Sequence, residues 1–435
     1  MEILLTIFYT SIFIFLIYKF RFFKIDSVSR TAICIVFVLK ICAGIFLFCI
    51  YTFYYRNRSE ADIFKYFDDS RAIHQALHDK PVDYFKMMTG LDNDNAYFDE
   101  HYYHQMNNWY RKYFSNTFND NHIIIRFNAF VRIFSKGFYQ VHNVFMNFIS
   151  LLGLVALFKF FQLTIKGRKN EIFFACFLIP SVIFWGSGVM KEGLLLFGIG
   201  FLMYYFHQLI HSKISFKNIF WIIVSVFILR YTKVYILAIL FPLLISYYWV
   251  EKTSNKNILL KYFSVLFIYL TIVLSIKYIS PQNDILKNMI LKQSTFINMS
   301  ESIKAGSLIK INHLQPNLSS VFTAIPGALY NSVFRPWFFE AHSFMILLNG
   351  LENLMFIIIC GLSLSCFSKR IKNKNIFIFS IFFVSITFTL IGLITPVIGA
   401  LVRYKMPVLP FMIIVFILIS DKNKLKKFLK FIPSF

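Results

Sequence analysis

Long apolar runs alternate with short basic segments along the whole chain of 435 residues. Two of the runs, Ile33 to Tyr54 and Ile376 to Ile394, stay apolar over about the 20 residues that a helix needs to cross a bilayer. A membrane β-barrel would instead show short segments in which apolar and polar residues alternate. The pattern therefore predicts an all-α, polytopic transmembrane protein.

About eleven crossings are expected when each basic loop is taken as cytoplasmic. They lie near residues 3–18, 31–54, 141–163, 171–187, 193–210, 218–230, 234–250, 262–279, 343–366, 376–394 and 407–420. Met1 to Tyr18 is counted as a membrane helix, because it lacks the basic start and small-residue cleavage site of a signal peptide. This arrangement places the N-terminus outside and the C-terminus inside.

The predicted crossings divide the chain into five regions. They are the first two transmembrane helices (1–54), a large extracytoplasmic loop (55–140), a transmembrane core (141–279), a second extracytoplasmic or re-entrant stretch (280–342), and C-terminal transmembrane helices with a basic cytoplasmic tail (343–435).

Composition agrees with a membrane protein and explains the strong positive charge. Hydrophobic residues make up 57% of the chain, and charged residues only 15%, whereas about a quarter of the residues of a soluble domain are charged. The net charge of +24 comes from Lys and Arg in the short loops between apolar runs. We therefore expect the basic residues to orient the chain and contact anionic membrane lipids, and we expect no nucleic-acid partner.

The first extracytoplasmic loop, residues 55–140, contains 11 of the 21 acidic residues. Its two ends have apolar residues at helical spacing, namely Ile63, Tyr66 and Phe67 at the start and Ile124, Phe127, Val131 and Phe134 at the end. This spacing predicts amphipathic helices on the membrane surface. The middle, from Pro81 to Asn121, is rich in Tyr, Asn, Asp and His, which suits either a folded loop that binds a polar ligand or a solvated loop.

Several charged residues fall on the predicted outer face, where the positive-inside rule leads one to expect few cations. They are Lys191, Glu192, Arg230, Arg335, Arg403 and Lys405. Arg offers a planar fork and Lys a point charge, and both suit the phosphate of a lipid carrier. The alternative is that each cation pairs with a protein carboxylate or extends to the membrane surface.

A set of carboxylates opens the first loop. Asp62, Tyr66 and Asp69 fall on one face of a predicted helix, and Asp68 is adjacent. Such carboxylates could take a proton from an acceptor hydroxyl or hold a divalent cation. Alternatively, Asp62 only starts the helix, because Ser59 to Asp62 matches a capping box.

Histidine pairs give the weakest signal for a metal. His74 and His78 are four residues apart, and His101 and His104 are three apart, but no His-Glu-x-x-His pattern is present. We therefore predict no metal ligands, and a divalent cation is the only cofactor considered.

Three short elements resemble those of a known superfamily. Asp62 with Tyr66-Phe67 resembles the first-loop element of the GT-C superfamily of polyprenyl-phosphate-dependent membrane glycosyltransferases. The segment from Arg403 to Pro410 resembles the Arg-Tyr-x-x-Pro-x-x-Pro element of its protein mannosyltransferase and aminoarabinose transferase branches. The segment Pro180 to Gly188, with Lys191-Glu192, is similar to an element of bacterial surface-polysaccharide members.

The resemblance implies a function and roles for two residues. It implies transfer of a sugar from a polyprenyl-phosphate-linked donor to a glycan, lipid or protein acceptor at the extracytoplasmic face, with Asp62 as general base and Arg403 on the carrier phosphate. The phosphate roles of Lys191, Arg230 and Arg335 rest on orientation alone. The chain departs from the family in having one crossing more before the first loop and in lacking an Asp-Glu pair.

Two other functions remain open at this point. A polysaccharide polymerase or ligase also works on lipid-linked glycans outside the membrane. A transporter or flippase would carry ionisable residues near the bilayer midplane and often internal repeats. Lys40 is the clearest charge within an apolar run, and no internal repeat is evident. The low-Gly composition, rich in Phe, Ile, Lys and Asn, is typical of an AT-rich bacterial genome and favours an inner-membrane location.

Overall fold

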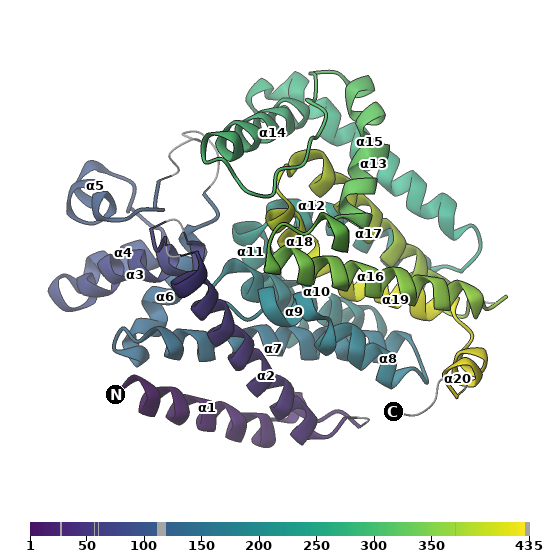
Figure 1. The fold of residues 1–435 in the computed structure, drawn as a ribbon, viewed down its shortest axis with the longest axis horizontal. Helices are drawn as coiled ribbons and strands as arrows, with labels where there is room; N and C mark the ends of the chain where they lie inside the picture. The colour runs from purple at the N-terminus through teal and green to yellow at the C-terminus, as the bar shows by residue number, and fades with distance from the viewer. Residues whose placement is uncertain (27, 56, 60, 111–118, 370, 431–435) are drawn as a thin grey trace. The chain divides into compact units, whose positions relative to one another are not determined.

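The computed structural model describes residues 1–435 apart from 27, 56, 60, 111–118, 370 and 431–435 (Figure 1). The described residues form helices joined by short connections, and their only β-structure is a few isolated bridges. The predicted all-α class is therefore confirmed.

Nine helical segments in the described residues are long and apolar enough to cross a membrane, which fits an integral multi-pass protein. They are Glu2–Lys19, Arg30–Tyr54, Tyr139–Thr164, Lys191–His211, Val234–Lys252, Ile258–Ile279, Phe344–Ser365, Lys374–Ile394 and Ile398–Ile419. Eight of them match a predicted crossing to within a few residues, whereas Ile398–Ile419 begins nine residues before the predicted crossing 407–420 and therefore includes Arg403 and Lys405.

The other two predicted crossings are not among these nine, so the count of about eleven is not confirmed. Residues 171–187 are divided into α8 (Lys169–Phe173), a π-helical turn (Phe174–Leu178) and α9 (Pro180–Trp185). Pro180 lacks the N–H that a continuous helix would use, and Ile179 before it is extended. Residues 218–230 lie in α11 (Phe216–Thr232), whose length of roughly 25 Å falls short of the about 30 Å hydrocarbon core.

The chain forms two compact units. The first unit comprises residues 1–163, 176–178 and 182–234, and the second comprises 164–175, 179–181 and 235–435. Each is described separately below.

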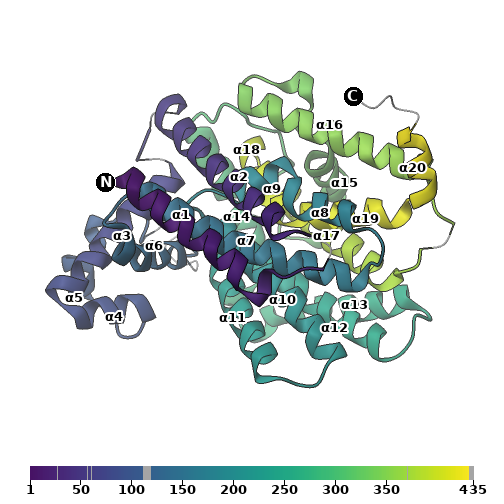
Figure 2. The ribbon, with the colours of Figure 1, turned by 90° about the horizontal axis from the view of Figure 1, so that it is seen from below.

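The first unit contains nine named helices besides part of α9 (Figure 1). They are α1 (Glu2–Lys19), α2 (Arg30–Cys49), α3 (Asp62–Asp79), α4 (Pro81–Thr89), α5 (Ala96–His101), α6 (His122–Ser135), α7 (Tyr139–Thr164), α10 (Lys191–His211) and α11. Helices α3 to α6 belong to the predicted first loop and lie grouped together in both views (Figures 1 and 2).

The first loop is a folded helical subdomain with its own apolar core. Helix α3 packs against α4 and α6, and the core includes Phe98, Tyr103 and Trp109 together with Met146 of α7 and Leu194 of α10. The folded alternative for the middle of the loop is therefore correct for its described part, while residues 111–118 lie outside the described residues.

The amphipathic helices were predicted at the right places, but the expectation that their apolar faces lie on a membrane is wrong. Ile63, Tyr66 and Phe67 of α3 are buried, as are Ile124 and Val131 of α6, because the two helices pack on each other. Only the outer side of α6 is exposed and apolar, at Phe130, Ile133 and Phe134.

Helices α7 and α10 cross at a contact between glycines. A Cβ atom on Gly200 would lie 1.9 Å from the carbonyl oxygen of Gly153, so the two backbones touch with no side chain between them. Such small-residue contacts let membrane helices approach closely.

We predict that Gly200→Ala destabilises the protein by about 1–3 kcal/mol, because its methyl group forces α7 and α10 apart. Gly361→Ala is the matched control, since no atom lies within 4 Å of a Cβ at that position. Thermal unfolding in detergent measures both variants. Equal melting temperatures would contradict the contact.

The second unit contains ten helices besides the first residues of α9. They are α8, α12 (Val234–Lys252), α13 (Ile258–Ile279), α14 (Ile285–Ser302), α15 (Leu318–Phe334), α16 (Phe344–Ser365), α17 (Lys374–Ile394), α18 (Ile398–Lys405), α19 (Leu409–Ile419) and α20 (Lys422–Lys430). Helix α17 is central, because it contacts α13, α14, α15, α18 and α19. The predicted outer stretch 280–342 supplies α14 and α15.

Candidate functional site

A cluster of charged side chains lies where the folded first loop meets α10 and α11. The Asp120 carboxylate forms ion pairs with Lys191 Nζ at 3.0 Å and with Lys233 Nζ at 3.6 Å. The three side chains are only 6–15% exposed, so their charges are largely removed from water. Lys191 Nζ also donates to Asn121 Oδ1 at 2.9 Å. We call Asp120, Asn121, Lys191 and Lys233 the lysine cluster.

Both cations are adjacent to candidate membrane spans, because Lys191 begins α10 and Lys233 directly precedes α12. Lys191 is the first residue of α10, after an extended Met190, and Lys233 directly follows α11. Glu192, buried in the first turn of α10, is well placed to interact with the positive end of the helix dipole. Arg230, one turn before Lys233, is exposed and lies beside the Tyr231 ring.

Hydrogen bonds from side chains hold the segment that carries Asp120. Asn119 Nδ2 donates to the carbonyl oxygens of Asn108 and Trp109, at 3.1 and 2.7 Å, and His122 Nε2 lies 2.8 Å from the Trp109 carbonyl. The His122 ring stacks on the Trp109 ring at 3.9 Å. The position of Asp120 therefore depends on the backbone of residues 108 and 109.

Asp69 fixes that backbone in turn. Its two carboxylate oxygens each accept one backbone N–H, from Asn107 and Asn108, at 2.8 Å. Asp69 is 3% exposed, and burial raises its pKa from 3.8 to about 6, although the two N–H groups oppose the shift. This engagement indicates that Asp69, predicted as a catalytic carboxylate, positions the loop and does not face a substrate.

The raised pKa of Asp69 makes the stability of the loop depend on pH. The folded state holds this proton more tightly than the unfolded chain, so the stabilisation is present below about pH 4 and is lost as the pH rises through about 6. Asp69→Asn cannot ionise. We expect wild type to lose on the order of 2 kcal/mol relative to Asp69→Asn between pH 4 and 7, measured by denaturant unfolding. Asp79→Asn, at an exposed carboxylate of the same helix, is the control and should keep the wild-type pH dependence.

Asp68 lies on the surface of α3. Its carboxylate forms two hydrogen bonds with the Arg58 guanidinium, at 2.6 and 3.0 Å. This exposed ion pair fastens the segment before α3 to the helix. Among the described residues, no hydrogen bond or ion pair joins Asp68 to the lysine cluster.

Asp62 lies on the same helix as Tyr66, the residue of α3 that Lys191 contacts. Lys191 Nζ lies 5.5 Å from the centre of the Tyr66 ring, and Tyr66 is one helical turn after Asp62. The capping-box alternative is wrong, because Ala61 is the N-cap and Ser59 Oγ donates to Asn57 Oδ1 instead. Asp62 is half-buried at the first position of the helix.

Lys40 of α2 holds the backbone that precedes Lys191. Its ammonium group is fully buried and donates to Gly186 O at 2.9 Å and Ser187 Oγ at 3.1 Å. Asn147 Nδ2 of α7 donates to Ser187 O at 3.0 Å. Non-helical backbone buried among membrane helices needs such partners, so Lys40 has a structural role in the break before α10.

Lys40→Met should leave the Gly186 carbonyl without this donor and destabilise the protein by about 1–3 kcal/mol. We expect faster amide hydrogen exchange at residues 186–191 together with a lower melting temperature. Lys217→Met, at an exposed lysine of the same unit, is the control. An equally or more stable Lys40→Met variant with unchanged exchange would contradict this role.

In the second unit, the ammonium group of Lys405 is enclosed by protein. It donates to the Ser332 and Arg335 carbonyl oxygens and to Asn353 Oδ1, each at 3.1 Å, and the residue is 2% exposed. Three protein acceptors leave Lys405 poorly suited to the phosphate role predicted for it. We assign it instead to joining α15, α16 and α18.

Two further charges of the second unit are also paired within the protein. Arg335 forms an ion pair with Glu340 at 2.9 Å, which is the protein-carboxylate alternative given above. Glu352 of α16 is buried and accepts the Ser181 backbone N–H at 2.7 Å and the Ser181 hydroxyl. Arg403 is half-buried on α18, two residues before Lys405.

The histidine pairs lie in the first loop. The His74 and His78 rings are in edge contact at 5.4 Å. Among the described residues, no three His, Cys, Asp or Glu side chains are grouped so that they could hold a metal ion.

The sequence analysis singled out Lys191 of the lysine cluster, together with its neighbours Glu192, Arg230 and Tyr66. It did not single out Asp120 and Asn121. Their signal was an uninterrupted polar run, Asn119 to His122, directly before the apolar periodicity of α6. Lys233 lies three residues after Arg230 and was not singled out either.

No protein-family model, curated protein or solved structure matches this chain.

Proposed function

We propose that this protein transfers a sugar from a polyprenyl-phosphate-linked donor to a glycan, lipid or protein acceptor at the face where the first loop folds. In this proposal that face is extracytoplasmic, the membrane is a bacterial inner membrane, and the products belong to surface polysaccharide or glycoconjugate assembly.

One observation carries the proposal. Lys191 begins a membrane helix, pairs with Asp120 beside Lys233, and lies over Tyr66, one turn from Asp62. Two cations are thus held beside candidate membrane spans, and one of them contacts the helix that carries the half-buried Asp62. A lipid carrier would bring its phosphate to this level of the membrane, because its chain lies in the hydrocarbon core.

In the proposed reaction the acceptor hydroxyl attacks the anomeric carbon of the donor sugar, and the bond from that carbon to the phosphate oxygen breaks. Asp62 takes the hydroxyl proton, and polyprenyl phosphate leaves with the electron pair. Lys191 and Lys233 stabilise the charge that grows on the departing phosphate. Arg403 keeps the phosphate role that the resemblance implies, as a separate prediction.

Asp120 has a defined place in the proposal. Without donor its single negative charge offsets part of the charge of Lys191 and Lys233, so a phosphate must compete with it. We therefore expect Asp120→Asn to bind donor more tightly, and Lys191→Gln or Lys233→Gln to bind it more weakly. If the lysines only neutralise Asp120, none of the three changes would alter donor binding.

The decisive measurement is sugar transfer by purified protein in detergent, supplied with lipid-linked sugars extracted from the host. Asp62→Asn should lower the transfer rate about 10²–10⁴-fold, the usual contribution of a general base, while donor binding is retained. Asp68→Asn is the matched control on the same helix and should stay within a few-fold of wild type. Arg403→Ala should weaken donor binding.

Other outcomes favour the alternatives. Transfer that survives Asp62→Asn but produces longer glycans would favour a polymerase or ligase. Movement of lipid-linked sugar across vesicles without transfer would favour a flippase.

A further inference from the structure

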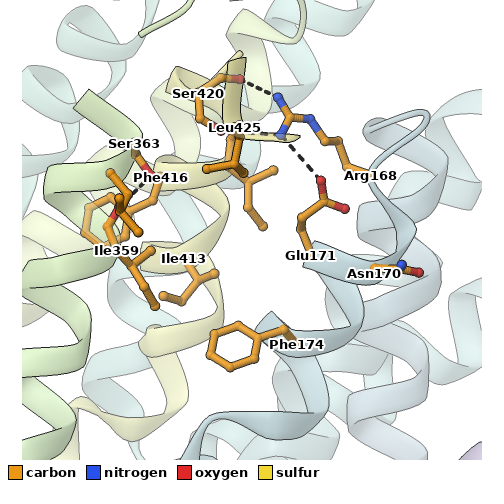
Figure 3. A pocket seen from close by; sticks show the side chains of 12 residues that line it. Arg168, Asn170, Glu171, Phe174, Ile359, Ser363, Ile413, Phe416, Ser420 and Leu425 are labelled. Carbon is orange, nitrogen blue, oxygen red and sulfur yellow. Dashed lines mark hydrogen bonds and ion pairs between the residues drawn. The ribbon is translucent and has the colours of Figure 1, made fainter. Parts of the chain in front are cut away.

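A cavity of about 350 Å³ lies in the second unit, where α16 and α19 end beside α8 and α20 (Figure 3). Its walls are mostly apolar and include Phe174, Ile359, Leu362, Ile413, Phe416 and Ile417. Arg168, Glu171 and Ser420 lie together at one side of it (Figure 3). The volume is within the usual range for small-ligand sites.

The cavity lies at the boundary of two membrane spans. Its apolar wall comes from the last two turns of the spans Phe344–Ser365 and Ile398–Ile419. Four of its polar residues, Arg168, Asn170, Glu171 and Ser420, lie outside the candidate spans, and Ser363 lies in the last turn of one. A lipid of the surrounding membrane has the same order of parts, with apolar chains within the bilayer and a polar head group at its surface.

The segments that adjoin the polar side of the cavity are basic, while the charged residues that line it, Arg168 and Glu171, are one of each sign. Arg168 Nη1 lies 3.5 Å from Glu171 Oε1 and 3.4 Å from Ser420 Oγ, and Nη2 donates to the Ser420 carbonyl oxygen. Lys422 Nζ donates to the Gly167 carbonyl oxygen, and Lys424 Nζ to that of Phe367 at 3.2 Å.

The excess of cations appears when the neighbouring sequence is counted. The adjoining segments 166–171 and 421–427 contain seven cations, Lys166, Arg168, Lys169, Lys422, Lys424, Lys426 and Lys427, against the two acids Glu171 and Asp421. Glu171 offsets the charge of Arg168, but the rim as a whole stays positive.

We propose that this cavity binds an anionic phospholipid of the surrounding membrane, with an acyl chain along α16 and α19 and the phosphate at the basic rim. Basic pockets between membrane helices recognise lipid head groups by this combination of charge and apolar wall. The site is independent of the lysine cluster and of the proposed glycosyl transfer.

Native mass spectrometry of the full-length protein in detergent tests the proposal, with phosphatidylglycerol and phosphatidylcholine as probes. Phosphatidylglycerol should bind at least fivefold more tightly, as expected from about 1 kcal/mol for each Lys or Arg near an anionic head group. Arg168→Gln and Leu362→Trp should each lower that affinity about fivefold, one by removing charge and the other by filling the cavity.

Two matched controls should bind like wild type. Lys256→Gln removes an exposed cation of the same unit outside the cavity, and Leu364→Trp adds the same bulk on α16 at a side chain that does not line it. Equal binding of the two lipids, equal losses in the controls, or displacement of phosphatidylglycerol by millimolar inorganic phosphate alone would overturn the proposal. Leu362→Trp keeps Arg168 intact, so it tests the site even if Arg168→Gln fails to fold.

Discussion

The cost of a charge removed from water governs this structure. An ammonium group within or at the edge of a bilayer needs oxygen atoms from its own protein, because neither lipid chains nor bulk water supply them there. Lys40, Lys191 and Lys405 meet this need in three ways. Lys40 uses a carbonyl and a hydroxyl, Lys191 uses a carboxylate and an amide, and Lys405 uses two carbonyls and an amide.

The three lysines differ in whether their partners could be replaced by a ligand. Lys40 and Lys405 are enclosed by neutral acceptors that belong to helix breaks and helix ends, so they stabilise architecture. Lys191 instead shares the carboxylate of Asp120 with Lys233, on a segment of the first loop. A carboxylate held between two lysines can give way to another anion, and this exchange links the electrostatics of the fold to the proposed binding of a phosphate.

The first loop turns local interactions into the placement of one side chain. Asp69 fixes the backbone at Asn108, and Asn119 then ties the segment that carries Asp120 to that backbone. The basic segments around Arg168 follow a different logic, because they adjoin a mostly apolar cavity. The protein thus separates a site built on a folded loop from a site built on the ends of membrane helices.

Local hydrophobic periodicity was enough to predict the all-α class, most of the apolar helices long enough to cross a membrane and the two amphipathic helices of the first loop. It could not predict which partners those helices and charges meet, because these depend on packing between distant segments. The apolar faces of α3 and α6 cover each other, and Asp69 and Lys405 are occupied by backbone groups from remote segments. Spacing along a helix shows which residues share a face, but only packing brings Asp120 to Lys191, which lies 71 positions further along the chain.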